Sequence, residues 1–174
     1  MSKRLSLAVL IVALCLAASG CASKDGSSLF SYASADAEYT AVFPSEYGDV
    51  IAGVTKTDGE VFLTVVSPER SAGMRVTVDA GNTCTLYPQS GDGIRLSRAA
   101  AEGLTGVISL LSKGESEVRS VKKTDDGAYT SAIYDGGEVT LDENGLPVAV
   151  TVRGDGERTV SIKDYKITAG TPAG

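Results

Sequence analysis

The sequence contains no histidine, and this absence excludes several classes of chemistry. Ser-His-Asp and Cys-His catalysis both need an imidazole that accepts a proton from the nucleophile. Most zinc and copper sites in proteins use histidine ligands, and a histidine pH switch is excluded for the same reason. We therefore expect a protein that is not an enzyme, with no catalytic residues, no metal site and no cofactor.

Cysteine is also scarce, with single residues at positions 15, 21 and 84. Cys15 and Cys21 belong to the N-terminal segment discussed next, which leaves Cys84 without a partner for an internal disulfide. Cys84 lies in a segment typical of a strand (83–87), and no base or helix N-terminus that would activate its thiol is evident nearby. We interpret Cys84 as a small buried hydrophobic residue.

Long apolar runs are absent apart from one at the N-terminus. Residues 5–16 are apolar except Ser6, and they follow Lys3 and Arg4. A membrane-spanning helix needs about 20 apolar residues, so this run is too short to be one. A basic start, an apolar middle and small residues before Cys21 are typical of an export signal, which we assign to residues 1–20.

The end of this segment, Leu-Ala-Ala-Ser-Gly-Cys at 16–21, resembles the lipobox of bacterial lipoproteins. The resemblance implies that the Cys21 thiol receives a diacylglycerol and that the chain is cut just before it. Ala18 stands where the pattern prefers leucine, and the alternative is an ordinary secretory signal with an incidental cysteine. Because two acyl chains give a stable hold, we expect an anchored protein on the extracytoplasmic face of the cell membrane.

The rest of the chain is predicted to have three parts. Residues 21–28 comprise the lipidated Cys21 and a flexible tether, residues 29–168 form one domain, and residues 169–174 form a tail. The signal holds two of the 16 basic residues and none of the 22 acidic ones, so the mature chain carries a net charge of −8. We expect no nucleic acid partner for such an acidic domain, and its membrane contact has to come from the anchor.

Short strands dominate the domain. Turn signals recur at 58–59, 80–82, 125–127, 135–137, 144–145 and 154–156, with β-branched residues between them, which predicts an antiparallel meander. Residues 61–66 are apolar at both even and odd positions, so we expect a central strand covered on both faces. The apolar alternation shifts phase near Lys163 and Asp164, which predicts a β-bulge.

One stretch has helical spacing instead. Within residues 97–112, Leu104, Val107, Ile108 and Leu111 follow the i, i+3, i+4, i+7 pattern of an amphipathic helix. Ser97 is placed to cap its start, Lys113-Gly114 would end it, and two internal glycines either weaken it or allow close packing. A second, shorter helix is predicted at 29–37. A long twisted sheet tends to curl. We therefore predict an α+β, mostly β fold: a curved antiparallel half-barrel of about eight to ten strands with one amphipathic helix on its concave face.

The order of strands, helix and closing meander over residues 38–167 resembles the LolA/LolB superfamily of lipoprotein carriers. The segment Leu-Asp-Glu-Asn-Gly-Leu-Pro-Val-Ala-Val at 141–150 is similar to a turn and strand of that family, and residues 66–76 resemble a segment of Gram-positive lipoproteins. The resemblance implies an apolar cavity for acyl chains and no catalytic residues. The arginine that latches the lid of the soluble carriers has no evident counterpart here.

Two functions follow as hypotheses. In the first, a non-enzymatic envelope lipoprotein binds a lipid or an acyl chain in a cavity lined by apolar residues of the helix and of the strand at 61–66: Phe62, Val65, Leu104, Val107, Ile108 and Leu111. In the second, the same scaffold is packed solid, and its surface holds or activates a protein partner in the cell envelope. A void along the helix favours the first hypothesis, and dense packing favours the second.

Overall fold

The structure is a computed structural model that describes residues 29–124, 127–154 and 156–168. The predicted signal (1–20), the lipidation site Cys21, the tether up to residue 28 and the tail (169–174) lie outside the described residues. No helix within the described ranges is long and apolar enough to cross a membrane.

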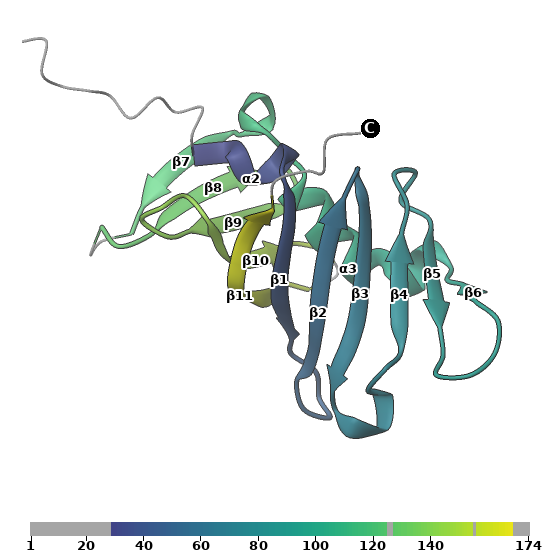
Figure 1. Cartoon of the computed structure of the whole chain (residues 1–174). Helices are drawn as coiled ribbons and strands as arrows, with labels where there is room; N and C mark the ends of the chain where they lie inside the picture. Colours follow the sequence, from purple (N-terminus) through teal and green to yellow (C-terminus); the bar gives the residue numbers. More distant parts are fainter. Residues whose placement is uncertain (1–28, 125–126, 155, 169–174) are drawn as a thin grey trace, which may run out of the picture.

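The described residues form a single antiparallel sheet with helices on one side (Figure 1). Its eleven strands are β1 (Asp36–Phe43), β2 (Val50–Thr57), β3 (Glu60–Ser67), β4 (Arg75–Val78), β5 (Cys84–Tyr87), β6 (Ile94–Arg95), β7 (Ser120–Lys123), β8 (Thr130–Tyr134), β9 (Gly137–Leu141), β10 (Pro147–Val152) and β11 (Arg158–Thr168). The helices are the short α2 (Ser31–Ser34) and the longer α3 (Arg98–Leu111), with single 3-10 turns at Glu69–Ser71 and Glu115–Glu117.

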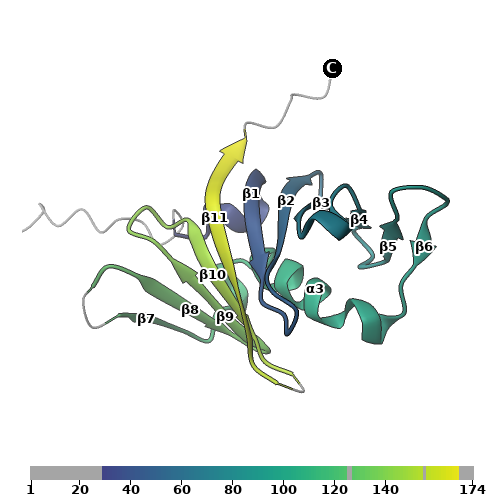
Figure 2. The same ribbon diagram turned by 90° about the horizontal axis from the view of Figure 1, so that it is seen from below.

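The strands follow one another as a meander that is split by α3. Their order in the sheet is β6-β5-β4-β3-β2-β1-β11-β10-β9-β8-β7, so the first and last strands pair at the centre. Helix α3 connects the two edge strands, β6 and β7, and passes across the concave side (Figure 2). The predicted curved half-barrel with an amphipathic helix is confirmed. The strand number exceeds the predicted eight to ten, since β6 has only two residues and therefore little sequence signal.

The two faces of the sheet differ sharply in burial. On β3, Val61 and Leu63 are buried against the concave side, whereas Phe62 and Val66 are 40% and 62% exposed on the convex side. The prediction that residues 61–66 are covered on both faces is therefore wrong. The sheet curves around α3 and α2, which leaves the outer face of β3 in solvent.

Helix α3 forms where its spacing predicted it. The hydroxyl of Ser97 accepts a hydrogen bond from the Ala100 backbone N–H, which is the expected N-cap, and the helix ends at Leu111. Its buried stripe contains Val107, Ile108 and Leu111, with Leu104 partly buried at its edge. The helix packs on β10 and β9.

Two smaller predictions also have clear outcomes. The β-bulge lies in β11, where the register against β1 shifts and Asp164 adopts a φ of 54°, so the Tyr165 side chain returns to the core. Cys84 is a free, buried cysteine at the start of β5, and burial raises the pKa of its thiol. The second predicted helix (29–37) is shorter than expected, because β1 already begins at Asp36.

Candidate functional site

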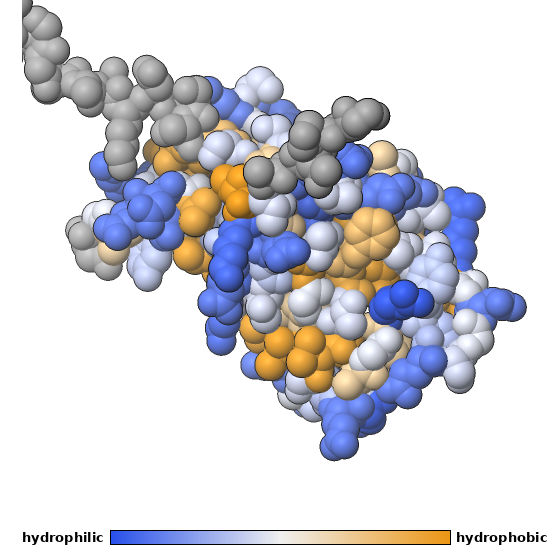
Figure 3. Space-filling view, in the orientation of Figure 1, coloured by the Kyte–Doolittle hydropathy of each residue, from blue (hydrophilic) through white to orange (hydrophobic). Residues whose placement is uncertain are grey.

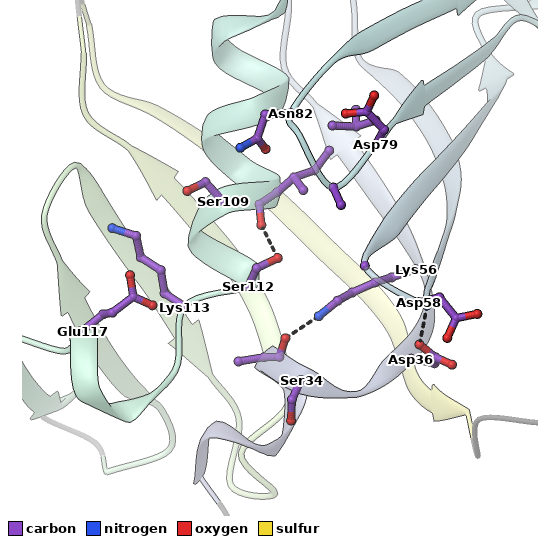
Figure 4. Close-up of a pocket in the computed structure, with 15 residues that line it drawn as sticks. Ser34, Asp36, Lys56, Asp58, Asp79, Asn82, Ser109, Ser112, Lys113 and Glu117 are labelled. Atoms are coloured by element: carbon purple, nitrogen blue, oxygen red, sulfur yellow. Dashed lines mark hydrogen bonds between the residues drawn. The ribbon is translucent and has the colours of Figure 1, made fainter. Parts of the chain in front are cut away.

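A cleft with a volume of about 610 Å³ opens at one end of the half-barrel (Figure 4). It lies between α2, the turns that join β2 to β3 and β4 to β5, and the C-terminal end of α3 with the segment that follows. Its lining residues are Ala33, Ser34, Asp36, Lys56, Asp58, Gly59, Val78, Asp79, Ala80, Asn82, Ile108, Ser109, Ser112, Lys113 and Glu117.

The cleft has three buried apolar wall residues, and most of its other lining residues are polar. Ile108, Val78 and Ala33 are all at most 9% exposed, and they come from α3, β4 and α2 respectively. The closest packing of α3 is with β9 and β10, on the other half of the sheet. The cleft therefore remains on the side of the helix that faces β2 to β5, and it gives access to the concave interior.

Lys56 connects the cleft to α2. Its side chain is only 8% exposed, and its ammonium group donates hydrogen bonds to the backbone carbonyls of Ala33 and Tyr32. Burial lowers the pKa of Lys56, while the nearby Asp36 carboxylate acts in the opposite direction. Because the carbonyls at a helix C-terminus lack partners in the helix, this ammonium group holds α2 against β2.

Buried tyrosines hold α2 from the other side. The Tyr32 hydroxyl lies 2.9 Å from the Tyr134 hydroxyl, which donates to the Lys113 carbonyl at 3.2 Å. Tyr165 donates to the Tyr32 carbonyl at 3.4 Å, and its ring stacks on Tyr39 with the ring centres 5.2 Å apart. Desolvation by burial raises the pKa of Tyr165 to about 12 and also raises the pKa of Tyr32 and Tyr39. These hydrogen bonds join α2 to β8, to β11 and to the end of α3.

The structure brings some of the predicted lining residues together and separates others. Ile108 lines the cleft, Val107 and Leu111 lie in the core beside it, and Leu104 packs at its edge. Val65 lies on the concave side and is partly buried. Phe62 lies on the opposite face, so its predicted place in the same chamber is wrong. Residues 62 and 65 are three apart in a regular strand, and side chains at that spacing point to opposite faces.

Lys56 and Tyr32 are the residues that the sequence interpretation missed. Lys56 follows Ala52 and Val54 at alternate positions of β2, and all three side chains are buried. The strand period was therefore a signal that could have placed this lysine on the covered face. Tyr32 had no comparable signal, because a four-residue helix is too short to show periodicity.

A second, shallower groove of about 430 Å³ lies on the convex face. Phe62 and Thr64 of β3 and Gly53 of β2 line it, together with Glu38 of β1 and Lys166 of β11. Apolar surface is also visible toward the lower ends of β1 to β3 on this face (Figure 3). Within residues 29–124, 127–154 and 156–168, no cluster of three or more cysteine, aspartate or glutamate side chains is suited to hold a metal ion.

The sequence matches no protein-family model and no curated protein. Among solved structures, the chain is similar to a LolA superfamily protein from Nitrosomonas europaea, with 10% sequence identity and a TM-score of 0.40. The match covers 78% of this chain and 85% of that chain.

Proposed function

We propose that this protein is a lipid-anchored, non-enzymatic lipoprotein of the cell envelope that binds the acyl chain of a lipid or another amphiphile in its half-barrel. The observation that carries the proposal is the cleft of about 610 Å³ between α2 and α3, which has the buried Ile108 in its wall. A cleft that combines buried apolar wall residues with a charged and polar rim suits a ligand with an apolar body and a polar end.

The way α2 is held supports the same function. Phe30, Tyr32 and Ala33 fill the end of the concave interior, where they cover apolar lining that would otherwise meet water. The hydrogen bonds that hold α2 run from side chains of the sheet and not from a strand ladder. An acyl chain that enters beside α2 would meet the same apolar lining that these side chains cover.

Substitution at Ile108 tests the proposal. A tryptophan at this position adds volume to the wall of the cleft, and we expect Ile108→Trp to weaken binding of the neutral probe N-phenyl-1-naphthylamine by at least tenfold. The measurement is a fluorescence titration of the mature chain carrying Cys21→Ser. The matched control is Thr64→Trp, which adds the same side chain on the convex face and should change affinity less than twofold.

Stability provides a second readout of the same site. Ile108 borders the cleft whereas Leu111 is enclosed, so Ile108→Ala should cost about 2 kcal/mol and Leu111→Ala nearer 4 kcal/mol in the free energy of unfolding. Native mass spectrometry of the purified protein should reveal a co-purifying lipid. Absence of probe binding by the parent protein, with equal losses for the two alanine variants, would contradict the proposal.

A protein-interaction module is the second candidate. The convex face favours it, because Phe62 and Val66 are exposed there and Val42 pairs with Ile51 next to them. Exposed apolar side chains that gather on one face mark interaction surfaces. A protein that binds no amphiphile, but whose cellular role is lost in a Phe62→Ser, Val66→Ser variant of unchanged stability, would support this second function.

A further inference from the structure

The charges around the cleft are unbalanced. Four carboxylates line it, from Asp36, Asp58, Asp79 and Glu117, against the two ammonium groups of Lys56 and Lys113. Figure 4 shows that these charged side chains lie on different sides of the cleft, with Lys113 and Glu117 opposite Asp36 and Asp58. The rim therefore carries a net negative charge.

Both ammonium groups are already engaged by the protein. Lys56 donates to two carbonyls of α2. Lys113 donates to the Asp135 carbonyl at 3.4 Å and lies 5.9 Å from the centre of the Tyr134 ring. Neither lysine forms an ion pair within the described part of the chain. An anionic group that entered the cleft would have to share these ammonium groups with the carbonyls that they already bind.

Most carboxylates of the rim have fewer partners among the described residues than the two ammonium groups. Asp58 and Glu117 have side chains without a hydrogen-bond or ion-pair partner in the described ranges, and Asp36 accepts one backbone N–H from Asp58. Asp79 is committed to its own turn, since one oxygen accepts from Gly81 and Thr83. Among the described neutral groups of the rim, the Asn82 amide and the Ser109 hydroxyl likewise have no side-chain partner.

From this arrangement we propose that the cleft selects amphiphiles whose polar head carries an ammonium group, and that it discriminates against anionic heads. The inference rests on the proposed function, because it assigns the ligand class of the same site. The apolar part lies along Ile108 and Val78, and the ammonium group lies at the rim between Asp58 and Glu117. Opposite charges attract and like charges repel over about 8–10 Å at physiological salt.

Competition between two lysolipids with the same acyl chain tests the inference. The protein is the mature chain with Cys21→Ser, loaded with N-phenyl-1-naphthylamine, and the competitors are lysophosphatidylethanolamine and lysophosphatidylglycerol below their micelle concentrations. We expect the ethanolamine lipid to displace the probe at about tenfold lower concentration. Raising the NaCl concentration from 0.05 to 0.5 M should reduce the difference, because salt screens the rim charges.

A charge variant tests whether the discrimination between the two lipids comes from the rim carboxylates or from the overall negative charge of the protein. Asp58→Asn with Glu117→Gln should reduce the discrimination to about twofold. The control Glu69→Gln, on the 3-10 turn after β3, removes an exposed carboxylate away from the cleft and should leave it unchanged. If the probe binds and the glycerol lipid competes equally well or better, the inference is wrong and the proposed function stands. If the probe does not bind at all, the proposed function fails first.

Discussion

The Tyr32 hydroxyl lies between the sheet and the segment that covers its end, and it forms a hydrogen bond with another phenol, that of Tyr134. The Tyr134 hydroxyl in turn donates a hydrogen bond to the Lys113 carbonyl. The Lys56 ammonium group donates to backbone carbonyls of α2, the short helix that contains Tyr32. Single polar atoms therefore join parts of the chain that are about a hundred residues apart. A buried hydroxyl that loses its partner costs more than the bond itself contributes, so these positions should be sensitive to small changes.

Removal of one hydroxyl should be measurable. Tyr32→Phe deletes the bond to Tyr134 and should lower the free energy of unfolding by about 1–2 kcal/mol. Tyr129→Phe is the matched control, since the Tyr129 ring is exposed, and it should change stability by less than about 0.5 kcal/mol. Urea unfolding followed by circular dichroism measures both. An equal effect of the two substitutions would contradict the role assigned to the Tyr32 hydroxyl.

The buried phenols also predict how stability depends on pH. The pKa of Tyr165 is raised to about 12, and the pKa of Tyr39 is raised as well, both by desolvation. Above pH 10 the unfolded chain loses phenolic protons that the folded chain retains, so stability is full below about pH 10 and falls as the pH rises toward 12. Lys56, with its lowered pKa, acts in the opposite direction as its amine deprotonates.

The measurement is the urea midpoint between pH 8 and 11.5. A Tyr39→Phe, Tyr165→Phe variant cannot ionise at these positions, so its decline above pH 10 should be shallower than that of the parent protein. Absorbance at 295 nm, which reports tyrosinate, should rise at lower pH in the unfolded chain than in the folded one. Identical titration of folded and unfolded protein would exclude this effect of burial.

At the level of the elements, helix α3 shows which features the sequence specifies. The spacing of Leu104, Val107, Ile108 and Leu111 and the N-cap at Ser97 are local signals, and both predicted the helix correctly. The sequence does not specify in the same way which side of each strand faces the helix. Residues 61–66 are apolar at both parities, so only the position of α3 and α2 decides that Leu63 is buried and Phe62 exposed.

From the sequence, the two glycines of α3 either weaken the helix or allow close packing, and the structure assigns one of these effects to each glycine. A Cβ on Gly106 would lie 2.9 Å from a methyl group of Val152, so this glycine allows the helix to approach β10 closely. A Cβ on Gly103 would meet nothing nearer than 3.5 Å, at the Arg158 guanidinium. Gly103 therefore only weakens the helix.

This contrast predicts opposite signs for one substitution. Gly103→Ala should raise the free energy of unfolding by about 0.5–1 kcal/mol, because alanine is the better helix former. Gly106→Ala gains the same helix propensity but forces Val152 to move, so it should be neutral or destabilising by about 1 kcal/mol. Thermal unfolding of the two variants side by side checks this. Equal stabilisation by both would show that α3 has room against β10.

On the scale of the whole molecule, the described structure begins at Leu29, eight residues after the predicted lipidation site. Residues 21–174 carry a net charge of −8, so charge does not draw the domain to an anionic membrane, and Cys21 is predicted to supply the attachment. The fold class was accessible from periodicity and turn residues. The cleft was not, because it depends on how residues from α2, β2, β4 and α3 meet.

Lipidation is tested by replacement of the cysteine. Cys21→Ser should abolish labelling with a radioactive fatty acid and leave the precursor uncleaved, since the modified thiol directs processing. Cys84→Ala is the matched control and should retain both labelling and cleavage, because Cys84 is buried in the folded domain. Normal processing and unchanged membrane retention of the Cys21→Ser protein would instead indicate an ordinary secretory signal.

The sheet has two free margins, because β6 and β7 each have a strand neighbour on one side only within the described residues. In a closed barrel, strand number and stagger fix the diameter. Here no strand pairing joins β6 to β7 in the described residues, so strand number and stagger do not fix the diameter. Helix α3 lies in the segment of chain that connects these two edge strands. Under the proposed function, a wall whose diameter is not fixed in this way would let the half-barrel accept ligands of different widths.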